Sequence, residues 1–272
     1  MRTLSWRASA VCALIASILP VSAQEAGRVS ISFSLMPRDL TLHEPLMLDF
    51  VLTNNSTASV ELDLGKDRKE AFQFVVVRPD GSDVTLRPHR SEGIGEGGNV
   101  TLAAGAQYEQ QLLFNEWFTF SAPGTYEIQV KLAHPIRGLA TGTFKDPARL
   151  TVDVLPRNEQ RLAETCTALK DKIETSKSYA EASAAAEALS HIDDSIVIPY
   201  IESSIGATHN VDLILIRGLE RMGNDVAVRS LINVYESRKG ESAAIARNAL
   251  VRLASNTSDG TLKVLIKTAL DK

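Results

Sequence analysis

The C-terminal third of this chain repeats at a period of about 30 residues, and this repeat restricts the possible folds more than any other feature. Leu189, Leu219 and Leu250 stand 30 and 31 residues apart. Each leucine belongs to a short apolar segment, which is followed by a polar gap with an aspartate and then by an apolar run of helical period. A repeat of this length is typical of stacked helical pairs, because one pair cannot bury its apolar face alone. We therefore predict an α-solenoid, a class of fold that mostly serves binding.

The apolar spacing after Pro156 changes to a helical period and predicts seven helices. Asn158 is expected to cap the first helix, because an asparagine side chain at this position accepts a bond from a free backbone N–H. Paired antiparallel, the seven give one leading helix and three helix pairs. Their expected ranges are 158–177, 179–192, 195–205, 211–222, 226–238, 242–254 and 261–270.

The segment Ala184–Asp194, followed by Ile198-Pro199-Tyr200-Ile201, closely resembles a HEAT repeat of the short, phycobilisome-lyase-like kind. That family has small residues where helices cross, leucine and isoleucine in the core, a polar turn with aspartate, and an apolar residue and proline at the start of the second helix. The next repeat has Arg229 where the first has Pro199. The resemblance covers residues 178–272 and implies a helical-repeat fold. It implies no single activity, because such repeats serve scaffolds, inhibitors, adaptors and enzyme subunits alike.

Residues from Val29 to about Leu155 alternate between apolar and polar with a period of two. The alternation predicts eight or nine half-buried strands with no helical segment between them. An apolar run over residues 72–77 ends in Arg-Pro-Asp-Gly at 78–81, a sequence that favours a turn. Strands at this spacing are typical of an antiparallel β-sandwich.

In the segment Ser121–Val130 a Pro-Gly turn is followed by Tyr126 and alternating apolar residues. This segment resembles the tyrosine-corner strand of immunoglobulin-like sandwiches, so we expect the Tyr126 hydroxyl to bond a backbone group. The whole N-terminal half loosely resembles immunoglobulin-like modules of the bacterial envelope, including small proteinase-inhibitor sandwiches. The predicted fold is thus an N-terminal antiparallel immunoglobulin-like β-sandwich followed by a short α-solenoid of HEAT-like helix pairs.

The first residues of the chain have the pattern of a secretory signal peptide. Arg2 and Arg7 give a basic start, residues 8–19 are apolar, and Val21-Ser22-Ala23 is a small-residue cleavage site. The apolar stretch is too short for a good membrane span, and we expect none in the mature chain. We therefore predict an exported protein, periplasmic or extracellular. The expected parts are a signal peptide over 1–23, a sandwich domain over 24–156 and a helical domain over 157–272.

Charge and cysteine content restrict the partners and the chemistry. Without Arg2 and Arg7 the chain has 27 basic residues against 33 acidic ones, a net charge of −6. Neither half is basic enough to suggest a nucleic-acid partner. Only Cys166 remains after the signal peptide, so no internal disulfide is expected. Cys166 lies on an apolar helical stripe, which indicates a buried structural cysteine.

No motif in the sequence predicts catalysis. None of the five histidines stands at metal-ligand spacing from a second one. The loop Arg87–Gly98 is rich in glycine but lacks the helix and the spacing of a phosphate-binding loop. Asp193-Asp194 falls in a turn between helices, where aspartate caps the next helix. We expect no catalytic residues, no cofactor, no metal site and no enzymatic activity.

The leading hypothesis is an exported, non-enzymatic interaction or scaffold protein. It would bind a protein partner through the second helices of the three pairs, at residues 195–205, 226–238 and 261–270, which we call the second-helix face. One alternative is a proteinase inhibitor or a periplasmic chaperone-like module that acts through sandwich loops such as Arg87–Gly98. Another is an enzyme with its site between the two domains. The candidate binding residues on the second-helix face are Tyr200, Glu202, Arg229, Asn233, Lys263 and Lys267.

Overall fold

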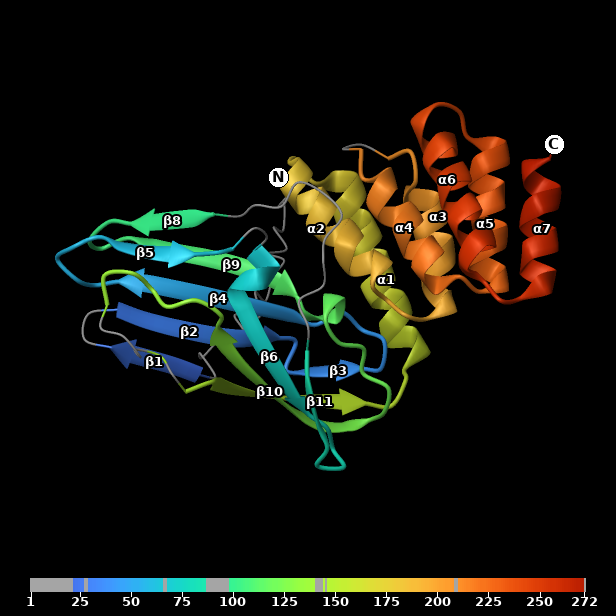
Figure 1. Cartoon of the computed structure of the whole chain (residues 1–272). Coiled ribbons are helices and arrows are strands. Elements are labelled where there is room, and N and C mark those ends of the chain that lie inside the picture. Colours follow the sequence, from blue (N-terminus) through green and yellow to red (C-terminus); the bar gives the residue numbers. More distant parts are fainter. Residues whose placement is uncertain are drawn as a thin grey trace, which may run out of the picture.

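A computed structural model describes residues 22–26, 29–65, 68–86, 98–139, 144, 146–207 and 210–271. Two layers of strands form the N-terminal part, and seven helices stack beside one end of them (Figure 1). The predicted fold class, a β-sandwich followed by a helical region, is confirmed. Residues 1–21 of the predicted signal peptide lie outside the described part, and the first strand spans the expected cleavage position between Ala23 and Gln24.

The strands form two main sheets and one short ribbon. The first sheet has the order β1 (Ser22–Ala26), β2 (Val29–Met36), β4 (Met47–Asn54) and β9 (Gln107–Leu113). The second has the order β3 (Asp39–Thr41), β11 (Ala148–Leu155), β10 (Gly124–Leu132), β6 (Phe72–Val77) and β7 (Asp83–Thr85). The ribbon pairs β5 (Val60–Asp63) with β8 (Asn99–Leu102). Their positions agree with the alternating pattern of the sequence, and β1 and β3 are additions to it.

One short pair of strands departs from the antiparallel arrangement of the predicted sandwich. The short strand β3 runs parallel to β11, with Leu40 beside Val154. The chain leaves the first sheet at Met36 and joins the second at Asp39, so β3 reaches the edge of that sheet in the direction of β11. Because β3 has a single buried apolar residue, Leu40, its sequence lacks the alternation of apolar and polar residues that predicts a strand.

The core of the sandwich lies between the two sheets. Alternate residues of β2 and β4 are buried there, and a cluster of aromatic rings fills the centre, among them Phe50 and Phe72 with their ring centroids 5.1 Å apart. Tyr126 is fully buried on β10, and its hydroxyl donates a hydrogen bond of 2.8 Å to the carbonyl oxygen of Ala122. The predicted tyrosine corner is therefore confirmed.

All seven predicted helices are present, with ends shifted by a few residues. They are α1 (Glu159–Thr175), α2 (Tyr179–Ser190), α3 (Ile198–Ser204), α4 (Asp212–Met222), α5 (Asp225–Ser237), α6 (Glu241–Asn256) and α7 (Gly260–Leu270). A short 3₁₀ turn over Ser195–Val197 precedes α3. Asn158 caps α1 as expected, since its side chain accepts from the N–H of Arg161 at 3.0 Å. Asp194 caps the 3₁₀ turn in the same way.

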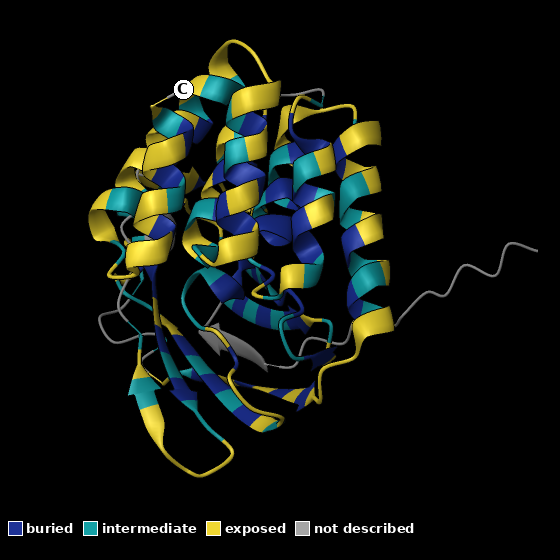
Figure 2. Ribbon diagram, turned by 90° about the vertical axis from the view of Figure 1, so that its right-hand side faces the viewer, coloured by how far each residue is buried: buried dark blue, intermediate teal, exposed yellow. Residues whose placement is uncertain are grey.

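The helices stack as a repeat array. Helices α2, α4 and α6 contact one another in succession, and α3, α5 and α7 form a second row. In Figure 2 the buried residues lie on the facing sides of the helices and the exposed ones on the outer sides. Small residues allow the close crossing of α2 and α4: a Cβ added to Gly218 would lie 2.7 Å from the Cβ of Ser190. No helix of the described chain has the length and apolarity needed to cross a bilayer.

The sandwich and the helices meet at a polar junction that the sequence did not predict. The carboxylate of Glu44, buried in the turn before β4, accepts bonds from the Thr41 N–H, from Nε of Arg161 and from Oγ1 of Thr165, all at 2.9–3.0 Å. Thr41 also accepts from the N–H of Asn158, in the linker that contains the predicted boundary at residue 156. These bonds attach the turn after β3 directly to α1.

Candidate functional site

The second-helix face is formed by α3, α5 and α7, which lie next to one another in that order. Four of its six predicted residues have exposed side chains: Arg229, Asn233, Lys263 and Lys267. Glu202 is half-buried between α3 and α5. Tyr200, expected on the solvent side, is also half-buried and packs against the helical core.

A groove of about 410 Å³ runs between α3 and α5, and we call it the α3–α5 groove. Three of the predicted residues line it, whereas Tyr200 and the two lysines of α7 do not. The lining residues are Ser195, Ile198, Pro199, Glu202, Val226, Arg229, Ser230 and Asn233. The groove brings three of the six predicted binding residues together: Glu202, Arg229 and Asn233.

Helical geometry explains why these residues share the groove. Val226, Arg229, Ser230 and Asn233 have the spacing i, i+3, i+4 and i+7, which places them on one side of α5. On α3, Glu202 follows Pro199 by one turn and lies on the same side. The contacts across the groove join residues about one repeat apart, 28 and 31 positions in the sequence.

Glu202 is held in the groove by neutral donors. Its carboxylate accepts a hydrogen bond of 3.0 Å from Oγ of Ser230 and another from Nδ2 of Asn233. Arg229 has a different environment, because its Nε donates to Asp225 at 2.8 Å. This bond raises the pKa of Arg229 above its ordinary value. The groove therefore contains Arg229, which is paired with an acidic residue, and the carboxylate of Glu202, whose two hydrogen-bond donors are neutral.

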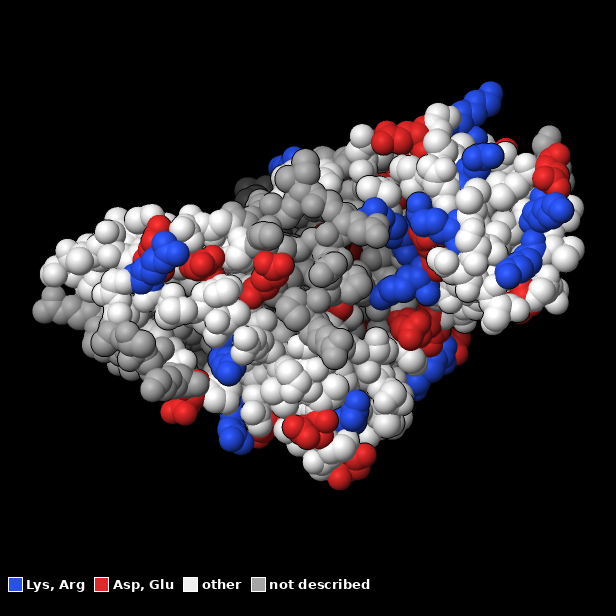
Figure 3. Space-filling model, in the orientation of Figure 1, with Lys and Arg blue, Asp and Glu red and all other residues white. Residues whose placement is uncertain are grey.

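Sequence reasoning did not include five of the lining residues in its predicted site: Ser195, Ile198, Pro199, Val226 and Ser230. Val226 is 53% exposed although it is apolar, and on α7 Val264 is 67% exposed. The repeat period is the signal that could have identified Ser230, because residues one period apart lie side by side in a stacked array. On the face shown in Figure 3, lysine and arginine side chains gather on the helical half with acidic side chains among them, and charges of both signs are scattered over the sandwich.

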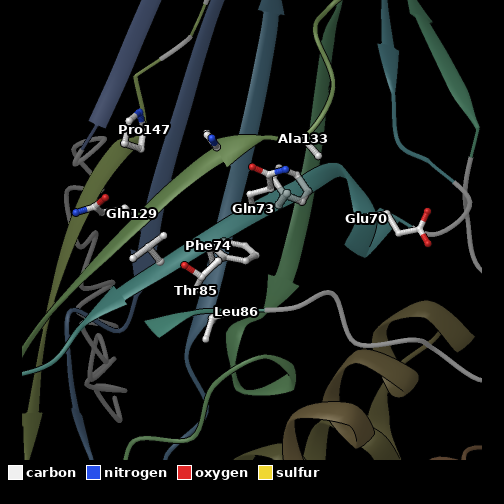
Figure 4. Close-up of a pocket in the computed structure, with 11 residues that line it drawn as sticks. Glu70, Gln73, Phe74, Thr85, Leu86, Gln129, Ala133 and Pro147 are labelled. Carbon is white, nitrogen blue, oxygen red and sulfur yellow. The ribbon is translucent and has the colours of Figure 1, made fainter. Parts of the chain in front are cut away.

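A second cavity, of about 510 Å³, lies against the sheet that contains β6, β7 and β10 (Figure 4). Gln73, Thr85, Gln129 and Lys131 contribute amide, hydroxyl and ammonium groups to it. These residues lie on or beside β6, β7 and β10, and sequence reasoning did not single them out. The cavity can offer hydrogen bonds to a polar ligand, but the described part of the chain places no cluster of catalytic type in it.

Between the sandwich and the helices, the buried carboxylate of Glu44 is bound by three protein donors. Every contact of Glu44 there is a structural bond to a neighbouring donor. Nδ1 of His43 is buried and has no hydrogen-bond partner among the described residues. No group of three or more His, Cys, Asp or Glu side chains that could hold a metal occurs in the described ranges. The loop Arg87–Gly98 of the inhibitor hypothesis lies outside the description, apart from Gly98.

Cys166 is buried within α1, as predicted. Burial disfavours the thiolate and, with the nearby charge of Asp194, raises the pKa of Cys166 to about 12. At neutral pH the sulfur is therefore a protonated thiol, the form that is a poor nucleophile. Asp194 itself caps the turn before α3 and pairs with Arg157, and the hydrogen bond from Arg157 lowers the pKa of Asp194.

No protein-family model and no curated protein sequence matches the chain. Among solved structures, the chain is similar in part to a β-glucosidase from Listeria innocua, with 18% identity, a TM-score of 0.28 and coverage of 47% of this chain and 16% of that one. A CARDB domain from Pyrococcus furiosus, in complex with di-metal ions, matches 47% of this chain over 94% of its own length, with 10% identity and a TM-score of 0.29.

An alkylpurine DNA glycosylase from Pseudomonas fluorescens, bound to DNA containing an abasic site analog, matches 48% of this chain and 31% of its own, with 14% identity and a TM-score of 0.26. This chain thus spans less than a third of the glucosidase and glycosylase chains. Similarities of this size carry no argument about activity, ligand or partner.

Proposed function

We propose that this protein is an exported, non-enzymatic interaction protein whose helical half binds a protein partner through the second-helix face. In this proposal the helix pairs are HEAT repeats of the short, phycobilisome-lyase-like kind, and the sandwich is the platform that holds them. The observation that carries the proposal is the α3–α5 groove, because it unites Glu202, Arg229 and Asn233 beside an exposed apolar side chain.

The composition of the second-helix face suits a protein partner. Interfaces combine apolar side chains with a polar, solvent-accessible rim. Here Val226 and Val264 are exposed apolar residues, and Lys263 and Lys267 add charged groups on α7. The polar junction at Glu44 supports the platform role, because its hydrogen bonds join α1 to the sandwich.

The inhibitor and chaperone alternatives place binding on the sandwich instead. The cavity beside β6 and β10 favours these alternatives, because its polar lining residues can form hydrogen bonds with a ligand. An enzyme site between the domains is the least supported alternative, since the buried carboxylate there is bound by three protein donors.

A comparison of two charge reversals tests the proposal. The mature protein, immobilised, would be incubated with envelope extract of its host, beside the variants Lys263→Glu on α7 and Arg247→Glu on α6. Both positions are exposed on helices, and only Lys263 belongs to the second-helix face. We expect a protein retained by the wild type and by Arg247→Glu to be reduced several-fold with Lys263→Glu. Equal retention by all three forms would reject the proposal. Loss of binding only in a further variant that lacks residues 87–98 would also reject it.

A further inference from the structure

We propose that the α3–α5 groove receives a basic side chain, lysine or arginine, from the protein partner. This inference rests on the proposed function, because it names the chemistry that the partner presents to the second-helix face. It is carried by one juxtaposition: a fixed carboxylate, Glu202, beside apolar side chains in a groove open to solvent.

The charge of Glu202 is uncompensated. Ser230 and Asn233, which donate to its carboxylate, are neutral, and no described residue forms an ion pair with it. The one cation that lines the groove, Arg229, is paired with Asp225 on its own helix. A cation that entered the groove could therefore form an ion pair with Glu202, because no described residue forms one with it.

The carboxylate is also held in position for such a cation. Ser230 bonds Oε2 and Asn233 bonds Oε1, so each oxygen has one donor from α5. A carboxylate offers about four lone-pair sites, which leaves one on each oxygen for a further donor. A guanidinium or ammonium group would form charge-assisted bonds there, and these are about twice as strong as bonds between neutral groups.

The neighbouring side chains fit the rest of a long basic residue. Ile198 and Pro199 line the groove from α3, and Val226 lines it from α5. The methylene stem of lysine or arginine packs against apolar groups of this kind while its charged head reaches a polar partner. An apolar side chain in the groove would remove water from Glu202 without replacing the hydrogen bonds of that water. An anionic side chain would be repelled by the carboxylate.

The lysines of α7 do not contradict this assignment. Lys263 and Lys267 lie outside the α3–α5 groove, because α5 separates α7 from α3. They are available to acidic residues elsewhere on the same partner.

Selection from a phage-displayed library of random 12-residue peptides on the mature protein would provide the probe. We expect the enriched peptides to share a lysine or arginine. Synthetic peptides from that set would be titrated against wild type, Glu202→Gln and Ser203→Ala, a control at an exposed neighbour on α3. Glu202→Gln keeps the shape of the side chain and should weaken binding roughly tenfold, the effect of losing one charge-assisted bond, while Ser203→Ala should not.

Exchanging the basic residue of the peptide for glutamine should cause the same loss in wild type and no further loss in Glu202→Gln. Enrichment without basic residues, or equal affinity of wild type and Glu202→Gln, would overturn the inference.

Hydrogen-exchange mapping with the bound peptide distinguishes failure of this inference from failure of the proposed function. Protection of α3 and α5 without dependence on Glu202 would reject the basic side chain alone, whereas protection confined to the sandwich would also reject the proposed function. Thermal melting of Glu202→Gln within error of wild type shows that the fold is intact.

Discussion

The junction between sandwich and helices depends on one arginine, and its replacement gives a quantitative prediction. Arg161 donates to Glu44 at 2.9–3.0 Å, to Oδ2 of Asp39 at 3.0 Å and to the Asp39 carbonyl at 2.7 Å. In Arg161→Met the apolar stem is kept and these bonds are lost. The side chain of Glu44 is 7% exposed, so its carboxylate would remain buried without a counter-ion.

The expected cost follows from the geometry. Removing one partner of a fully buried ion pair costs about 3–5 kcal/mol. Arg161 is 31% exposed, and Glu44 keeps the donors Thr41 and Thr165. Both facts reduce the penalty, and we expect a loss of about 2–3 kcal/mol in the free energy of unfolding.

Urea unfolding with two probes would measure this loss. Trp117 lies in the sandwich, so its fluorescence reports that domain in the mature protein, while circular dichroism at a helical wavelength reports the other. We expect coincident transitions in the wild type and separated midpoints in Arg161→Met. Arg149→Met is the matched control, because Arg149 pairs with Glu127 at the surface, is 66% exposed, and should cost less than about 1 kcal/mol. Equal losses in the two variants would refute the structural role of the junction.

Four further substitutions test the fold by urea or thermal unfolding. Tyr126→Phe removes only the hydroxyl of the tyrosine corner and should cost about 1 kcal/mol, whereas no change would mean that the bond to the backbone contributes nothing. Gly218→Ala should destabilise by about 1–3 kcal/mol despite the better helix propensity of alanine, because the new Cβ would contact Ser190, and a gain in stability would disprove the tight crossing. Leu219→Ala and Leu250→Ala should each cost about 2–5 kcal/mol, with the larger loss at Leu219 in the central pair, and the reverse order would contradict the repeat assignment.

The helical half was predictable because its physics is local and periodic. Leucines 30 and 31 residues apart indicated the repeat, and Asn158 and Asp194 cap the helical segments that follow them, as the sequence suggested. The alternating strands were predictable for the same reason. The strand β3 was not, because it is held by Leu40 and by pairing with a strand more than 100 residues away.

The candidate site was predictable only in part. The exposed positions of α5 and α7 follow from helical spacing, but Tyr200 turned inward against the core. Glu202 finds Ser230 and Asn233 one repeat away, a relation visible only when the repeats are aligned. Glu44 accepts a hydrogen bond from Arg161, which lies 117 positions away in the sequence, and no local sequence pattern indicates such a contact.

Site-specific photo-cross-linking in the native host tests the central claim most directly. A photoreactive phenylalanine analogue would replace Lys263 on the second-helix face, Arg247 on α6 or Lys131 beside the sheet cavity, one at a time. All three side chains are exposed, so each can tolerate the substitution. The account predicts a discrete cross-linked adduct with another protein from position 263 and none from positions 247 and 131. An adduct from position 131 or 247, with none from 263, would contradict it.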